Sequence, residues 1–127
     1  YQHEQHLWKT ESNIANSAGN LCLHLVGNLN HFIGTILGGS AYVRQREREF
    51  SDKHVPRQEM LRMVEETMIT VEQSLGNITD SKLQEPYPVE VFGYPMTTEY
   101  FMIYLAMHLD YHLGQINYHR RLLDVTE

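Results

Sequence analysis

The segment "AMHLDYHLGQI", residues 106–116, lies within a helical period that begins after Thr97, a suitable N-cap, and continues to about Leu123. His108 and His112 stand four residues apart, so a helix presents both on one side. At an advance of about 100° per residue, this side of the helix is mostly apolar. Its other members are Phe101, Leu105, Leu109, Ile116, His119 and Leu123, with Gln115 at the edge. The two histidines are therefore predicted to face a helical core.

Two more helices are predicted upstream of this one. The first spans about residues 16 or 17 to 37, because Ser17 is a plausible N-cap and the glycines at 38 and 39 permit a left-handed end. The second spans about residues 56–75, because proline suits a first helical position and Gly76 suits a terminator. Three amphipathic helices predict an all-α protein, a helical bundle forming one domain over residues 1–127.

The two connections between these helices differ in composition. Residues 40–55, "SAYVRQREREFSDKHV", are predicted to be a polar connection dense in charge. Residues 85–95, "EPYPVEVFGYP", cannot be helical, because the prolines and Gly93 interrupt the pattern. They permit only a short extended piece at residues 89–92.

A third histidine is predicted to face the same core from the first helix. His24 falls on a side of that helix shared with Leu21, Leu25, Asn28, Phe32 and Thr35. A buried imidazole nitrogen without a partner costs about 1–3 kcal/mol, so three converging histidines would destabilise a core that gave them no role. A divalent cation removes this cost by accepting one lone pair from each ring. The alternative is that each histidine is an ordinary core residue satisfied by hydrogen bonds.

Several other functions are disfavoured by the sequence. A zinc-protease helix needs glutamate directly after its first histidine, and this position holds Leu109, while Asp110 lies on the opposite side. The net charge of −6 argues against nucleic acid and anionic membranes as partners. No apolar run approaches the roughly 20 residues that span a bilayer. The single cysteine, Cys22, excludes an internal disulfide framework and fits a cytoplasmic location.

Three segments taken together resemble one known superfamily. They are "NSAGNLCLHLVGNLN" at 16–30, "RQREREF" at 44–50 and "AMHLDYHLGQINYHRRLL" at 106–123. In this order they resemble the DinB-like superfamily of metal-binding four-helix bundles, and within it a bacterial subgroup with an R-x-R-x-x-E-F segment, close to the YfiT-like metal-dependent hydrolases. The resemblance implies an up-and-down four-helix bundle whose first helix would lie largely before Tyr1. It also implies a homodimer, because members of the superfamily often dimerise.

The same resemblance implies a divalent metal, nickel or zinc, held by His24, His108 and His112. These are the three histidines that the helical wheels place toward the core. No catalytic residue is assigned.

Five further residues are candidates for supporting or substrate-binding roles. The arginines at 44 and 46, with Glu49, either clamp the charged connection to a helix or place an arginine where it binds a substrate anion. Asn28 and Gln115 either orient the ligands or the substrate, or form local hydrogen bonds in the core. The sequence leaves these alternatives open.

Three neutral histidines would leave coordination positions open on the ion, which is typical of catalytic rather than structural sites. Characterised relatives in the wider superfamily include thiol-dependent transferases and an isomerase. The resemblance therefore favours an enzyme that transfers a low-molecular-weight thiol to an electrophile or hydrolyses a small substrate. The alternatives are a stress-associated protein with a structural metal and a metal-free helical interaction module.

Overall fold

A computed structural model describes residues 1–125 and confirms the all-α class, since it contains no strand within that range. An isolated antiparallel bridge pairs Pro86 with Thr97, and residues 89–92 form bends rather than an extended piece. The helices in chain order are η1 (Glu4–Trp8), α1 (Ala18–Leu29), η2 (Asn30–Thr35), α2 (Arg46–Ser51), α3 (Arg57–Gly76), α4 (Asp80–Gln84) and α5 (Thr98–Leu123).

The predicted helix starts are confirmed by side-chain caps. Ser17 Oγ accepts a hydrogen bond from the backbone N–H of Asn20, and Thr97 Oγ1 accepts one from the N–H of Tyr100. The start of α3 is displaced by one residue, because Pro56 is its N-cap rather than its first helical residue. These caps fix where α1 and α5 begin, and therefore which turn of each helix carries its histidines.

The first long helix ends at Thr35, two residues before the predicted end at 37, and it changes geometry on the way. After Leu29 it continues as the π-helical segment η2, in which the N–H of Ile36 donates to the carbonyl of His31. Gly39 then ends the helical path with a φ of +69°, the left-handed conformation that glycine adopts without strain. A π-helical turn is uncommon and often lies next to a functional site. Here it begins less than two turns beyond His24.

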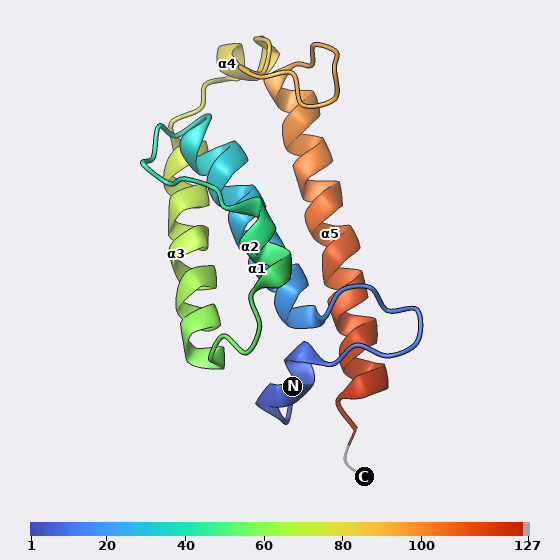
Figure 1. Ribbon diagram of the computed structural model, residues 1–127. Coiled ribbons are helices and arrows are strands. Elements are labelled where there is room, and N and C mark those ends of the chain that lie inside the picture. The colour runs from blue at the N-terminus through green and yellow to red at the C-terminus, as the bar shows by residue number, and fades with distance from the viewer. Residues whose placement is uncertain (126–127) are drawn as a thin grey trace.

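Helix α1 lies between α3 and α5 (Figure 1), and it runs parallel to α3. Residues later in the continuation of α1 contact residues later in α3. Asn30 Nδ2 donates to Thr67 Oγ1 over 2.8 Å, and further along both helices Gly38 lies against Ser74. The connection at residues 40–55 must therefore return along the length of α1 before α3 can begin. The up-and-down order that the resemblance implied is wrong at this point, because a crossing connection replaces a short turn.

Helix α5 runs antiparallel to α1. Near its start Phe101 stacks edge-on with Phe32, at a centroid separation of 5.3 Å, whereas further along α5 His108 and His112 lie beside the earlier His24. Phe101 is fully buried in the main hydrophobic cluster, as the helical wheel predicted. The histidines thus follow the hydrophobic core directly along the face of α5 that contacts α1.

The charged connection contains a short helix, α2, that the sequence pattern did not predict. Asn20, which is fully buried on α1, donates from Nδ2 to the backbone carbonyls of Glu49 and Asp52, each over 2.9 Å. These bonds hold the C-terminal end of α2 against α1. A six-residue helix of mostly charged residues has no apolar periodicity to reveal it.

The outer face of α5 carries exposed apolar side chains along its whole length. None of the helices in the described part of the chain is both long and apolar enough to cross a membrane. A four-helix bundle is not complete within residues 1–125, where only α1 with its π-helical continuation, α3 and α5 are long. The exposed apolar side chains on the outer face of α5 include Tyr100, Ile103, Met107, Tyr111, Tyr118 and Leu122.

Candidate metal centre

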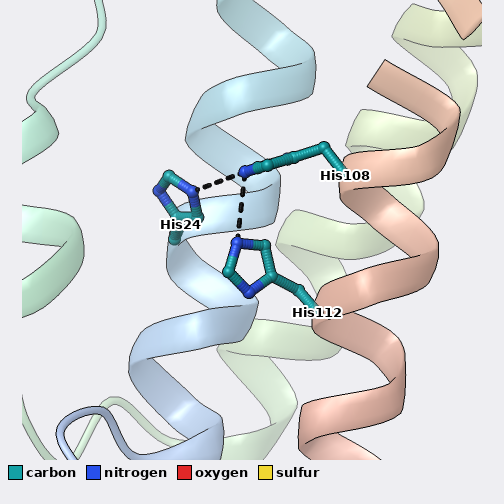
Figure 2. Close-up of side chains that lie close together, drawn as sticks. All are labelled: His24, His108 and His112. Carbon is teal, nitrogen blue, oxygen red and sulfur yellow. Dashed lines mark hydrogen bonds between the residues drawn. The ribbon is translucent and has the colours of Figure 1, made fainter. Parts of the chain in front are cut away.

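The three predicted histidines meet between α1 and α5 (Figure 2). His108 Nε2 lies 3.2 Å from His24 Nε2 and 3.1 Å from His112 Nε2, and one nitrogen from each ring falls within 4.8 Å of the others. Metal–nitrogen bonds of about 2.0–2.1 Å separate neighbouring ligand atoms by roughly 2.8–3.4 Å, the shorter values at octahedral and the longer at tetrahedral angles. The spacing of the three nitrogens is therefore compatible with one metal ion.

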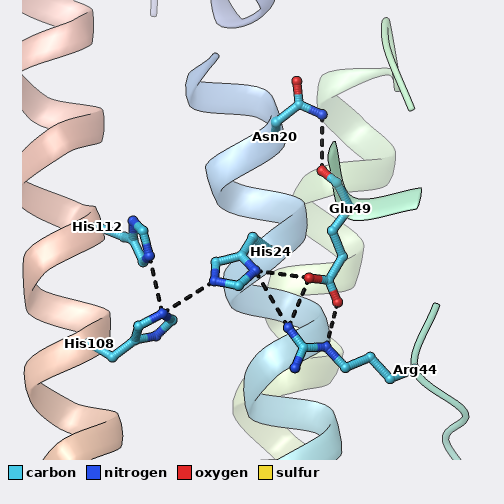
Figure 3. A network of polar contacts seen from close by, with 6 residues as sticks. All are labelled: Asn20, His24, Arg44, Glu49, His108 and His112. Carbon is cyan, nitrogen blue, oxygen red and sulfur yellow. Dashed lines mark hydrogen bonds and ion pairs between the residues drawn. The ribbon is translucent and has the colours of Figure 1, made fainter. Parts of the chain in front are cut away.

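The tautomer of His24 is set by Glu49. His24 Nδ1 donates to Glu49 Oε2 over 2.9 Å, as Figure 3 shows. Arg44 Nη2 also lies 3.5 Å from this nitrogen, but the carboxylate contact is shorter, and an ionised carboxylate can only accept. The proton of neutral His24 therefore lies on Nδ1, so that Nε2 presents a lone pair to the other two rings.

The tautomer of His112 follows from a hydrogen bond to a residue nearby in the sequence, on the same helix α5. Its Nδ1 donates to Oε1 of Gln115 over 2.6 Å, and Gln115 in turn donates from Nε2 to the hydroxyl of Tyr111 over 3.4 Å. Gln115 lies three residues further along the same helix. As for His24, this hydrogen bond leaves Nε2 of a neutral His112 without a proton and turned toward the centre.

His108 lies between these two lone pairs. Its pKa is lowered to about 4 by burial, by the neighbouring His112 and His24, and by the positive charge of Arg44, so the ring is neutral near pH 7. A proton on its Nε2 could satisfy only one neighbour, and its buried Nδ1 has no partner in the described part of the chain. A divalent cation would satisfy all three Nε2 atoms at once, which fits the donor set better than hydrogen bonds do.

Glu49 is held in place on its other side by Arg44. Arg44 donates from Nε to Oε1 over 2.7 Å and from Nη2 to Oε2 over 2.9 Å, while its guanidinium lies 5.6 Å from the centroid of the Phe32 ring. Burial by itself would raise the pKa of Glu49, but the hydrogen bonds from His24 and Arg44 outweigh it and lower that pKa. Glu49 is therefore an ionised acceptor despite being buried.

Gly27 explains how the carboxylate comes so close to α1. A β-carbon at this position would collide with Oε1 and Cδ of Glu49. The missing side chain leaves a space on the helix surface, one turn after His24, that the carboxylate fills. The glycine of the "HLVGN" segment is thus required by a close approach rather than by an unusual backbone conformation.

A family model described as "Protein of unknown function (DUF1572)" matches residues 2–127. The chain belongs to the DUF1572 family. Neither a curated protein nor a solved structure matches it.

Of the other predicted residues in this DUF1572 protein, Arg46 and Asn28 form no hydrogen bond to the histidine rings within the described residues. Arg46 is exposed and covers the ring of Phe50, at 5.5 Å from its centroid. Asn28 is buried, and within residues 1–125 its Oδ1 has no hydrogen-bond partner, so this atom forms no hydrogen bond to the three histidines. Glu49, Arg44 and Gln115 are the candidates that the structure connects to the rings.

His119 occupies a separate polar site at the end of α5. It is buried, whereas the sequence suggested only a position on the core-facing side near the helix end. Its Nδ1 lies 2.7 Å from the hydroxyl of Tyr1, and its Nε2 bonds to the carbonyl of Lys9 over 2.9 Å. Both ring nitrogens are therefore engaged away from the histidine cluster.

The cluster in this DUF1572 protein offers three ligands to an ion. Within the described residues, no cysteine or carboxylate joins the three histidines. Glu49 lies behind His24, on the Nδ1 side of the ring, and so supports a ligand instead of being one (Figure 3). His24 is buried but His108 and His112 are only half-buried, so the remaining coordination positions would be most accessible from the α5 side.

Proposed function

We propose that this DUF1572 protein binds one divalent metal ion, nickel or zinc, through the Nε2 atoms of His24, His108 and His112. The observation that carries the proposal is the convergence of three imidazole nitrogens. Two of these rings form hydrogen bonds through Nδ1, on the side away from the cluster, with the oxygens of Glu49 and Gln115. Such outward hydrogen bonds are typical of histidines that ligate metals.

We further propose that the ion is catalytic and that the protein transfers a low-molecular-weight thiol to an electrophile or hydrolyses a small substrate. A divalent ion held by neutral histidines lowers the pKa of a bound water or thiol toward neutrality. The half-buried His108 and His112 support access for a small molecule from the α5 side. The DinB-like resemblance of the three motif segments favours the thiol as substrate.

One observation favours a second function, in which the ion is purely structural. The three histidines join α1 to α5, helices that are far apart in the sequence, and much of α5 has an uncovered outer face. An ion here would cross-link the two helices and stabilise their packing. The protein would then be a non-catalytic, stress-associated metalloprotein.

Metal content measured by mass spectrometry on untagged protein tests the site. Wild type is expected to hold about one divalent ion per chain after reconstitution at neutral pH, and both His24→Ala and His108→Ala are expected to lose it. His54→Asn is the matched control, because His54 is exposed, lies outside the cluster and has a positive φ that asparagine tolerates. No ion in the wild type, or equal retention in all variants, would overturn the proposed site.

Titration of the cobalt-loaded protein with a small thiol separates the two functions. A catalytic site is expected to show a thiolate-to-metal absorption band that saturates with thiol concentration. A structural ion is expected to show no such band, and its removal should lower the melting temperature in the absence of any ligand.

A further inference from the structure

We infer that Glu49 is a positioning residue of the metal centre: it fixes the tautomer and ring orientation of His24, and Arg44 and Gly27 fix Glu49. Because the ion itself belongs to the proposed function, this role rests on that function. The hydrogen bond from His24 Nδ1 to Glu49 Oε2 is 2.9 Å long and links two buried side chains on different helices. It is a carboxylate–histidine pair directed at the point where the three rings meet.

The alternative role for Glu49 is to fasten the charged connection to α1. That fastening is already made without its side chain, since Asn20 binds the backbone carbonyls of Glu49 and Asp52. The pair formed by Arg44 and Glu49 lies entirely within the connection, so it ties that segment to itself and not to α1. The contact that joins the carboxylate to α1 by a hydrogen bond is the one with His24.

The surroundings of the carboxylate also specify which oxygen meets which donor. Arg44 reaches Oε1 through Nε and Oε2 through Nη2, a two-pronged contact that fixes the plane of the carboxylate. Oε1 occupies the space that Gly27 leaves open on α1. Oε2 is thereby directed at His24, and rotation of the carboxylate would break both contacts with Arg44.

The variant Glu49→Gln tests this role because it keeps the size of the side chain. An amide has one oxygen, whereas Arg44 and His24 together direct three N–H groups at the two carboxylate oxygens. If the oxygen stays with Arg44, the amide NH2 group faces His24 Nδ1 and favours a proton on Nε2, where the metal should bind. Glu47→Gln is the matched control, since Glu47 is exposed on the same short helix.

The first measurement needs no metal. In metal-free protein with ¹⁵N-labelled histidine, long-range ¹H–¹⁵N spectra are expected to show His24 protonated at Nδ1 in the wild type and in Glu47→Gln. In Glu49→Gln the proton of His24 is expected to move to Nε2 in a substantial fraction of molecules. An unchanged His24 tautomer in Glu49→Gln would overturn the inference.

The second measurement is the dissociation constant for Zn²⁺, determined by competition with a chromophoric chelator. Loss of an outer partner of a ligating histidine typically weakens metal binding by about 10–100-fold, which is the expectation for Glu49→Gln. Glu47→Gln should bind Zn²⁺ like the wild type. Zn²⁺ binding that is equal in wild type and Glu49→Gln, with a lowered melting temperature, would make Glu49 a fastening residue only.

Gly27→Ala provides a second route if Glu49→Gln does not fold. It retains every charged group but displaces the carboxylate from its space on α1, so it should shift the His24 tautomer and weaken Zn²⁺ binding in the same direction. A failure of the proposed metal binding can be distinguished from a failure of the inferred role of Glu49. Absence of Zn²⁺ binding in the wild type contradicts the proposed function, whereas an unperturbed His24 tautomer in both variants contradicts the role of Glu49.

Discussion

The two sides of the histidine cluster are built differently. On the α1 side, His24 is 7% exposed and is supported by a chain of contacts through Glu49 to Arg44, which comes from a separate segment. On the α5 side, Nδ1 of His112 is hydrogen-bonded to Gln115 on the same helix, and Nδ1 of His108 has no partner among residues 1–125. One side is fixed by tertiary contacts, and the other depends on the geometry of a single helix.

This difference indicates a division of roles between the two sides. A ligand held by buried, charge-assisted hydrogen bonds has little freedom, so the α1 side sets where an ion would lie. The half-buried rings on α5 would have more freedom to adjust if an exogenous ligand bound at the proposed ion. The asymmetry therefore predicts that equal substitutions on the two sides have unequal effects.

The largest difference is expected between His24→Ala and His112→Ala. Both variants should lose the bound ion, but only His24→Ala leaves the buried Glu49 without one of its donors. We expect it to lower the free energy of unfolding of the metal-free protein by about 1–3 kcal/mol. His112→Ala should change that free energy by less than about 1 kcal/mol, because a half-exposed ring is lost.

Urea unfolding followed by circular dichroism measures this difference in chelator-treated protein. Equal destabilisation by the two variants would contradict the asymmetry between the two sides.

A glycine on each side gives the next comparison. Gly27→Ala should destabilise the protein by about 1–3 kcal/mol, because the added methyl group meets the carboxylate of Glu49. Gly114→Ala on α5 should stabilise it by about 0.5–1 kcal/mol, since no described residue beyond the local helix backbone lies within 4 Å of the new β-carbon and alanine favours the helix. Thermal unfolding of both variants should give shifts of opposite sign, and shifts of the same sign would contradict the close approach at Gly27.

The smallest effect is expected from Gln115→Ala. The contact with His112 lies within one turn of an exposed part of α5, where water can replace the amide oxygen. We expect Zn²⁺ affinity to fall by only a few-fold, below the roughly 10–100-fold loss expected for a fixed outer partner. Isothermal titration calorimetry of this variant beside Glu49→Gln measures the ratio. A larger loss in Gln115→Ala would reverse the comparison.

The parts of the site that the sequence predicted are those encoded within single helices. The caps at Ser17 and Thr97 and the apolar periodicity of α5 place each histidine on a helix face facing the core. Convergence of His24 with the pair on α5 then follows from packing those faces together. Local signals sufficed because each helix is long and its pattern regular.

The parts that the sequence did not predict depend on contacts between distant segments. Helix α2 is short and charged, and its position is set by Asn20 on another helix. The parallel run of α1 and α3 depends on the path of residues 40–55, which no periodicity specifies. The sequence makes Glu49 a candidate supporting residue only because it belongs to the R-x-R-x-x-E-F segment at 44–50. Its contact with His24 needs both the returning connection and the space at Gly27.

The most direct test of the metal centre is anomalous diffraction at the zinc absorption edge from crystals of the zinc-loaded protein. We expect one strong peak between α1 and α5, about 2.0–2.1 Å from Nε2 of His24, His108 and His112, with Glu49 still bound to Nδ1 of His24. A peak elsewhere, ligation through Nδ1, or no peak between these helices would contradict it.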